Sequence, residues 1–290
     1  MIVIEKLLMQ KYINYCTDLN IIGGQITRNG TLLLIESTLQ ELDFFERPVP
    51  KNSWTIRVIK KDNIETINLK NVPLIPTEID LFSDGTLLIV QGRCLKEGKK
   101  IERNARRYNV NGQLIEAFTL GDGISNVQID EQDTIWVSYF DEGIFGNFGW
   151  EQPIGCKGLV AFSKNGQKLW EAADFSIIDC YAMNVVSSKE VYFYYYDDFN
   201  LIELSNMKET VRYLVQGENT IHQFVFDSLG LIGQVDLDTV MRFRVYDRTI
   251  KPKGKLVLVD ENNKRINGQI FMRGSFLYAF GKDAIYNSKL

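Results

Sequence analysis

Six polar turns, each followed by a strongly apolar run, recur along this 290-residue chain. Successive turns lie 55, 48, 56, 41 and 44 residues apart, counted between their second residues. Self-similarity at roughly 40–50 residues is typical of the four-stranded blades of a β-propeller. The pattern therefore predicts an all-β fold, a six-bladed β-propeller of four-stranded blades. The turns are Asn29-Gly30, Asp84-Gly85, Gln132-Asp133, Ser188-Lys189, Leu229-Gly230 and Arg273-Gly274.

Two Asn-Gly pairs repeat the same local sequence in the second and third predicted blades. Asn111-Gly112 and Asn165-Gly166 lie 54 residues apart, and each is followed by Gln and then by a Glu-Ala pair. Asn-Gly between alternating apolar segments is a strong hairpin signal, because both residues adopt positive φ at little cost. We therefore expect the third and fourth strands of these two blades to meet at these pairs.

The repeat predicts a single propeller domain over residues 1–290. The last blade lacks an outer strand, and the N-terminal segment 2–9 is expected to complete it and to remove an exposed sheet edge. Seven irregular blades or two stacked sandwiches are alternative arrangements of the same strands. The expected blades are 20–70, 75–119, 123–173, 180–215, 220–266, and 267–290 completed by 1–10.

The charge of the chain argues against a nucleic-acid partner. The formal net charge is −4 and the sequence pI is near 5.3, whereas nucleic-acid binding needs a basic stripe. One basic cluster is present, and we interpret it as a solvated hairpin tip, which is the usual role of a charge block. It comprises Lys96, Lys99, Lys100, Arg103, Arg106 and Arg107.

Cysteine usage and the N-terminal sequence predict a cytoplasmic location. The four cysteines are scattered, and none forms a C-x-x-C pair, which fits a reducing compartment. The N-terminal residues lack the features of a signal peptide. No stretch approaches the 18 or so apolar residues of a membrane span, so no membrane partner is expected.

Residues for nucleophilic or phosphate chemistry are scarce. His222 is the one histidine, and no G-x-S-x-G sequence accompanies it, so we favour a structural, hydrogen-bonded histidine over a member of a Ser-His-Asp triad. The glycine patterns at 121–123 and 143–146 lack the strand-to-helix context of a phosphate-binding loop. The catalytic residues, if there are any, are therefore unknown from the sequence.

Each predicted blade carries a polar side chain near the start of its first strand. These positions share one strand face, because side chains alternate with a period of two, and in a propeller they approach the central channel. Their polarity is explained either by channel solvation or by a ligand or metal site. The residues are Gln25, Glu78, Asp80, Asn126, Gln128, Asn184, Gln223 and Gln269.

The sequence at 124–137, and more loosely Ser83-Asp-Gly-Thr-Leu-Leu, resembles the blade motif of NHL-repeat propellers and of the regucalcin/gluconolactonase family. In the lactonase branch a divalent metal in the channel is held by Glu, Asn and Asp side chains. The resemblance implies that Glu78, Asn126 and Asn184 are the counterparts. Gln223 stands where that family has its Asp, and Gln25 where it has an N-terminal Glu, and fewer charged ligands weaken Ca²⁺ binding.

The third predicted blade contains a connection of unusual length, residues 139–157, rich in glycine and aromatic residues. Long loops on rigid scaffolds often carry function. Tyr139, Asp141, Glu142 and Trp150 could form a face for a ligand or a peptide. The alternative is a loop that packs on itself and covers the channel mouth.

The sequence as a whole favours a non-catalytic ligand- or protein-binding propeller. Its site is expected at the channel mouth, formed by the polar first-strand residues with His222, and at the 139–157 segment. The partner is an unspecified small molecule or protein, and no cofactor is expected. One alternative is a hydrolase of a lactone or ester that uses Ca²⁺ or another divalent metal, with Asp80 or Asp141 as base. A further alternative is a carbohydrate-binding propeller with Trp136 or Trp150 as stacking platform.

Overall fold

All six predicted turns join the first and second strands of a four-stranded antiparallel meander. The computed structural model describes residues 3–217 and 220–290. Three of the turn glycines, Gly30, Gly85 and Gly274, have φ of 80°, 79° and 60°, a region that glycine enters without the steric cost of a Cβ. The polar turns of the sequence therefore mark the first hairpin of each meander.

The chain divides into two units. Residues 19–180 form one, which we call the continuous unit, and residues 1–18 together with 181–290 form the other, which we call the composite unit. Nearly all described secondary structure is β, because the described residues contain one short helix, α1 (Asp141–Phe145).

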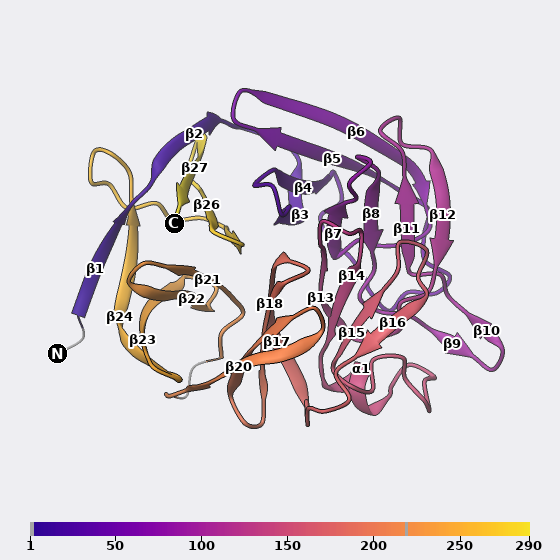
Figure 1. Ribbon diagram of the computed structural model, residues 1–290. Helices are drawn as coiled ribbons and strands as arrows, with labels where there is room; N and C mark the ends of the chain where they lie inside the picture. The colour runs from indigo at the N-terminus through magenta and orange to yellow at the C-terminus, as the bar shows by residue number, and fades with distance from the viewer. Residues whose placement is uncertain (1–2, 218–219) are drawn as a thin grey trace. The chain divides into compact units, whose positions relative to one another are not determined.

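The continuous unit contains three meanders (Figure 1). The first is β3 (Asn20–Ile26), β4 (Leu32–Ser37), β5 (Asn52–Lys60) and β6 (Asn63–Val72). The second is β7 (Glu78–Leu81), β8 (Leu87–Val90), β11 (Ala105–Tyr108) and β12 (Leu114–Phe118), and the third is β13 (Ile124–Ile129), β14 (Ile135–Tyr139), β15 (Leu159–Phe162) and β16 (Lys168–Glu171). A small hairpin, β9 (Lys96–Glu97) with β10 (Lys100–Ile101), is inserted between β8 and β11.

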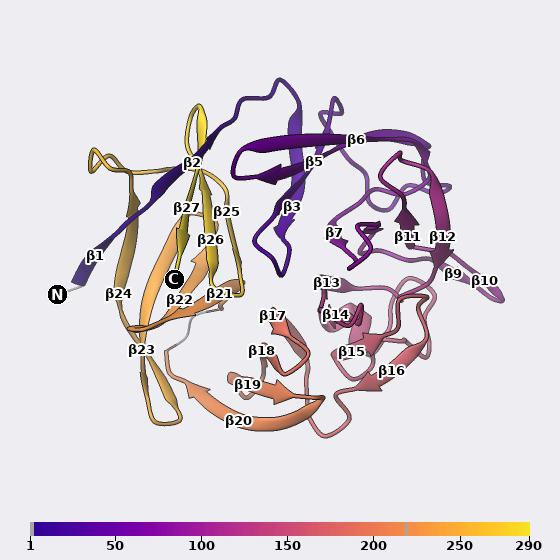
Figure 2. The same cartoon turned by 45° about the horizontal axis from the view of Figure 1, so that its top comes forward.

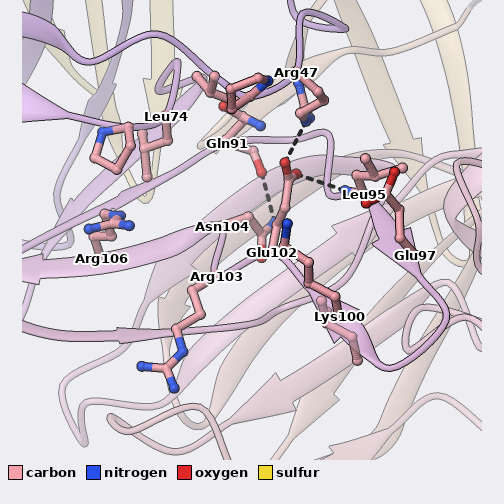
Figure 3. A pocket seen from close by; sticks show the side chains of 14 residues that line it. Arg47, Leu74, Gln91, Leu95, Glu97, Lys100, Glu102, Arg103, Asn104 and Arg106 are labelled. Atoms are coloured by element: carbon pink, nitrogen blue, oxygen red, sulfur yellow. Dashed lines mark hydrogen bonds and ion pairs between the residues drawn. The ribbon is translucent and has the colours of Figure 1, made fainter.

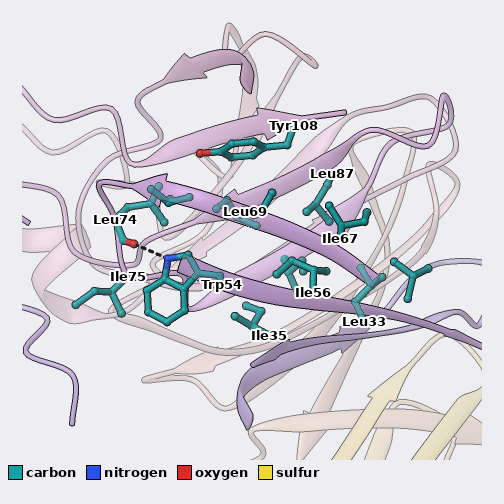
Figure 4. Close-up of a cluster of buried hydrophobic side chains, with 14 residues drawn as sticks. Leu33, Ile35, Trp54, Ile56, Ile67, Leu69, Leu74, Ile75, Leu87 and Tyr108 are labelled. Atoms are coloured by element: carbon teal, nitrogen blue, oxygen red, sulfur yellow. Dashed lines mark hydrogen bonds between the residues drawn. The ribbon is translucent and has the colours of Figure 1, made fainter. Parts of the chain in front are cut away.

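The first strands of these three meanders lie beside one another, with β7 between β3 and β13 (Figure 2). The sheets pack face to face, and the core lies between successive meanders. Figure 4 shows the cluster between the first two, where Trp54 is almost fully buried and its indole N–H donates to the Leu74 carbonyl at 3.2 Å. Burial of such alternating β-branched and aromatic side chains is the main stabilising contribution to the sheets.

The composite unit also contains three meanders. The first two are β17 (Asp179–Ser187), β18 (Glu190–Tyr196), β19 (Asn200–Ser205) and β20 (Lys208–Val215), and then β21 (Gln223–Asp227), β22 (Gly230–Asp236), β23 (Thr239–Tyr246) and β24 (Thr249–Val259). Their last strands, β20 and β24, share two parallel residue pairs, so the two meanders belong to one sheet. The third meander is β25 (Ile270–Arg273), β26 (Phe276–Phe280), β27 (Ala284–Lys289) and β2 (Gln10–Asn14).

The N-terminal residues complete the last meander, but with a different segment from the one that we expected. The strand that pairs with β27 is β2 (Gln10–Asn14). The expected segment 2–9 instead supplies β1 (Val3–Leu8), which runs parallel to β24, and Met1 and Ile2 lie outside the described residues. Met9, between the two strands, is fully buried in a cluster with side chains of β21 to β26.

In the ranges 3–217 and 220–290, no helix has the length and apolar character that crossing a bilayer requires.

Candidate functional site

Polar side chains on the first strands connect neighbouring meanders of the continuous unit. The Gln25 side-chain amide donates to the carbonyl of Ile79 at 2.9 Å and to that of Val127 at 2.8 Å. The buried carboxylate of Asp80 accepts the Ile129 N–H of the next meander at 2.6 Å and the Leu81 N–H at 2.8 Å. These side chains satisfy backbone groups of first strands that have no ladder partner on that side.

Glu78 makes the same kind of connection with a perturbed carboxyl group. Its Oε2 accepts from the Asn126 side-chain amide at 3.2 Å and from the Val127 N–H at 3.3 Å. Burial raises the pKa of Glu78 from 4.5 to about 8, and the Val127 N–H opposes this only in part. Gln128 donates to the Asn126 side-chain oxygen at 3.0 Å. One carboxyl oxygen of Glu78 and the side-chain oxygen of Asn126 therefore already accept hydrogen bonds.

In the composite unit, amide side chains make the hydrogen bonds that connect neighbouring meanders. The side chain of Asn184 donates to the Phe224 carbonyl at 3.0 Å and accepts the Gly274 N–H at 2.7 Å. Gln223 donates to the Ile270 carbonyl and accepts the Met272 N–H, both at 2.8 Å. An amide can do both because it carries one acceptor oxygen and two donor hydrogens.

The remaining channel-mouth candidates are exposed. His222 and Gln269 both belong to the composite unit, and both are exposed. The predicted metal ligands are divided between the units, with Glu78 and Asn126 in the continuous unit and Asn184 in the composite unit. Within the described ranges, no three His, Cys, Asp or Glu side chains are grouped so that they could hold a metal ion. A role of these residues in binding stays a prediction.

The 139–157 segment belongs to the continuous unit and packs against the rest of it. The buried Tyr139 hydroxyl donates to the Leu120 carbonyl at 2.5 Å, and the Trp150 indole N–H donates to the Cys94 carbonyl at 2.6 Å. The Phe148 carbonyl accepts the Lys96 N–H at 3.1 Å. Asp141 stays exposed at the start of α1.

A buried arginine holds this segment in place. Arg93 pairs with Glu142 of α1 and with Asp122, the latter at 3.0 Å. Its guanidinium also lies over the rings of Phe45, Phe140 and Phe148, at 5.2, 5.6 and 5.3 Å from their centroids. The hydrogen bond from Arg93 lowers the pKa of Glu142. Paired charges and cation–π contacts of this kind stabilise a loop that has little sheet structure of its own.

Two tryptophans named in the carbohydrate-binding alternative do not face solvent. Trp136 is fully buried, with its indole N–H donating to Asp130 at 3.0 Å, and Trp150 is 5% exposed. The prediction of a solvent-facing stacking platform at either residue is therefore wrong. The apolar run around Trp136 and the aromatic ring of Trp150 both reflect core packing.

A pocket of about 510 Å³ opens in the continuous unit beside the β9–β10 hairpin (Figure 3). Pockets of this volume are in the usual range for small-molecule sites. Four cationic side chains and two carboxylates line it, whereas the whole chain has a net charge of −4. The six charged residues are Arg47, Glu97, Lys100, Glu102, Arg103 and Arg106.

Part of the pocket is marked in the sequence by the basic cluster at 96–107. Lys100, Arg103 and Arg106 belong to the basic cluster that was expected to be only a solvated hairpin tip. The cluster does form the β9–β10 hairpin, with Lys99 exposed near its tip, but it then runs along one side of the pocket. Arg47 comes from the β4–β5 connection, where no sequence pattern marked it.

Among the comparisons with known proteins, one structural likeness bears on the fold and none assigns an activity. A family model described as the YxzG family matches residues 154–288, just under half of the chain. No curated protein matches the sequence. Virginiamycin B lyase from Staphylococcus aureus is similar in structure over 97% of this chain and 99% of its own, with a TM-score of 0.53 and 12% identity.

A gluconolactonase from Xanthomonas campestris matches over 96% of both chains, with a TM-score of 0.46 and 9% identity. The lyase likeness confirms an all-β fold of the propeller type. Identity of 12% carries no activity from one propeller to another, because propellers host many unrelated functions.

Proposed function

We propose that this chain is a non-catalytic protein that binds a small molecule in the basic pocket of the continuous unit. The observation that supports this most strongly is the pocket itself, about 510 Å³ in volume with four cationic side chains around it. The 139–157 segment contributes indirectly, since the Phe148 carbonyl holds the backbone of Lys96 at the base of the β9–β10 hairpin.

The scaffold of this proposal is a six-bladed propeller. Four meanders form separate four-stranded sheets. The other two are joined into one sheet by the short β20–β24 pairing, and β1 adds to that sheet beside β24. Six meanders with the same strand order, three in each unit, support six blades. The β2–β27 pairing would then join the two ends of the chain within one blade.

The metal-dependent hydrolase is the weaker candidate, because its expected ligands have other partners. The Asn126 side chain donates its amide N–H to Glu78 and accepts from Gln128 at its oxygen. A cation held by both Glu78 and the Asn126 side-chain oxygen would require this amide to turn, which would break both hydrogen bonds. A Glu78 that holds its proton at neutral pH also supplies less charge to a cation than an ionised carboxylate.

The proposed site is tested by narrowing the pocket with a bulky side chain. Ile101→Trp adds a ring at the rim, where Ile101 is 41% exposed, so the core is not disturbed. Ile115→Trp is the matched control, at an isoleucine that is 46% exposed on β12 and does not line the pocket. A fragment panel screened by ligand-observed NMR should give binders whose affinity falls at least about tenfold in the first variant only, a loss of roughly 1.4 kcal/mol.

Two results would contradict the proposal. The first is a set of binders that all keep their affinity in Ile101→Trp, which would place the site elsewhere. The second is hydrolysis of glucono-1,5-lactone that depends on added Ca²⁺, Mn²⁺ or Zn²⁺ and is lost in Glu78→Gln. That second result would establish the hydrolase in place of the binding protein.

A further inference from the structure

We infer that the ligand of this pocket is an organic anion, in which a carboxylate or phosphate group is attached to an apolar body. The inference rests on the proposed function and adds the chemical class of the ligand. Four kinds of observation lead to it: the charge balance, the unused donors, the occupied amides and the apolar walls.

The charge balance of the pocket is positive even after its internal ion pair is taken into account. Glu102 pairs with Arg47 at 2.5 Å and accepts the Leu95 N–H at 2.8 Å. This leaves Lys100, Arg103 and Arg106 against Glu97. Clefts with low-dielectric walls concentrate such a field, which favours an anionic ligand over a neutral or cationic one.

Two of the guanidinium groups also carry N–H groups without a hydrogen-bond acceptor in the described part of the chain. The Nε of Arg106 and the Nη2 of Arg47 are buried, and neither has an acceptor among the described residues. The rest of the Arg106 guanidinium is oriented by a hydrogen bond with Tyr108 on the same face of β11. Both atoms have almost no accessible surface, so a ligand oxygen reaches them only when the side chains turn. A carboxylate or phosphate oxygen is the acceptor that arginine binds best.

The neutral polar groups of the pocket are already in use. The Gln91 side chain accepts the Ile75 N–H and donates to the Arg93 carbonyl, both at 2.7 Å. Asn104 donates to the carbonyls of Gln91 and Gly121 at 2.8 Å and accepts the Leu120 N–H at 3.0 Å. Both donor hydrogens of Asn104 are in use, and Gln91 is almost fully buried, so neither amide is placed to bind the hydroxyls of a sugar. None of the lining residues is aromatic, so no ring offers a stacking surface for a sugar or base.

Apolar side chains form the rest of the lining. A pocket that combines such walls with a few cationic groups matches a ligand with one charged end and one apolar end, because each part then leaves water for a suitable partner. The apolar lining residues are Pro48, Val49, Pro73, Leu74, Leu95 and Ile101.

The test uses 8-anilinonaphthalene-1-sulfonate, a fluorescent anion with an apolar body, as the probe for the full chain. Lys100→Gln/Arg103→Gln removes two exposed cations from the rim, and Lys61→Gln/Lys70→Gln removes two exposed cations of the same unit that do not line the pocket. We expect the probe to bind about tenfold more weakly to the first variant and unchanged to the second. Thermal melts by circular dichroism check that both variants fold.

Competition identifies the chemical class. Decanoate and decyl phosphate should displace the probe, and decanol should not, while the stronger of the two anions identifies the preferred head group. If decanol competes as well as decanoate, or if the two double variants bind the probe equally, the ligand is not selected by its charge. The anion inference then fails while the proposed function stands. If probe binding is unchanged in Ile101→Trp, the pocket is not the site, and both fail.

Discussion

Within each unit, polar side chains connect neighbouring first strands, and in the continuous unit these side chains include two carboxylates beside the amide of Gln25. Glu78 and Asp80 connect β7 to β13 with carboxylates, which accept backbone N–H groups. Asn184 and Gln223 connect strands of the composite unit with amides, which donate and accept at once. A carboxylate titrates and an amide does not, so the connections made by Glu78 and Asp80 can respond to pH, whereas those made by Asn184 and Gln223 cannot.

The two units differ also in how they are assembled. The continuous unit is one stretch of chain, whereas the composite unit combines residues 1–18 with residues 181–290. Its last meander is complete only when β2 pairs with β27. The stability of the composite unit should therefore depend on the N-terminal residues. The continuous unit needs no strand from a distant part of the chain.

Deletion of residues 1–14 should destabilise the protein more than any single substitution. It removes β1, β2 and the buried Met9, and it exposes the edge of β27. Loss of a buried Met alone costs about 2–5 kcal/mol, so the melting temperature should fall on the order of 10 °C or more, if the protein folds at all. Replacing residues 97–100 of the self-paired β9–β10 hairpin by Asn-Gly is the control and should cost far less. An unchanged melting temperature after the deletion would show that β2 does not stabilise the last meander.

Asp80→Ala should be more destabilising than Gln223→Ala. Both remove side-chain hydrogen bonds to a neighbouring first strand, but Asp80 is fully buried and Gln223 is only partly buried. Water can replace the lost partner at Gln223, whereas the Ile129 N–H would stay unsatisfied. We expect a loss of about 3 kcal/mol for Asp80→Ala and about 1 kcal/mol for Gln223→Ala in urea unfolding. The reverse order would mean that burial does not decide the strength of these connections.

Glu78→Gln should change how stability depends on pH. The pKa of Glu78 is raised to about 8 in the folded protein, while the unfolded chain loses this proton near pH 4.5. Between these two values the folded state binds the extra proton, so the free energy of unfolding falls as pH rises through this window. The glutamine variant should therefore lose less stability than the wild type between pH 5 and pH 9 in thermal melts.

Gln223→Glu extends the same comparison to the composite unit. A carboxyl group placed among those amide connections should introduce a pH dependence of the same sign as that of Glu78. If Glu78→Gln leaves the pH profile unchanged, the carboxyl group at position 78 is ionised in the folded protein, and the distinction between the two units disappears.

Lys164→Gln should have the smallest effect, with a pH dependence of opposite sign. Lys164 pairs with Asp84 and Asp133 at 2.8 Å each. Burial raises the pKa of each carboxyl group, but the hydrogen bond from Lys164 and those from Thr86 or Ser83 outweigh this and lower it. Such groups stabilise the fold above their unfolded pKa near 3.8, and this stability is lost as pH falls further.

The loss in Lys164→Gln should be below about 1 kcal/mol at pH 7, since these pairs are partly solvated. It should shrink as the pH drops below about 4. Urea titrations at pH 7 and pH 3 check both statements, and a loss that is larger at pH 3 would contradict them.

The strands and their turns could be predicted from the amino-acid sequence alone. Asn-Gly at 111–112 and 165–166, and the glycines at 30, 85 and 274, each fall in a hairpin between strands. Turn chemistry and alternation are local properties, because positive φ and the two-residue period depend only on neighbours along the chain. For that reason the polar residues at the starts of the first strands could also be found from the sequence.

The contacts of those residues became known only from the packing of the sheets. The sequence left solvation and ligand binding open for Gln25, Glu78 and Asn184, and the structure shows all three bonded to neighbouring strands. Packing also buries Trp150 and brings Arg47 close enough to Glu102 to form a salt bridge. Partners that lie tens of residues apart meet only when sheets pack, so local pattern does not determine the hydrogen-bond partners of a polar side chain, a raised pKa or the lining of a pocket.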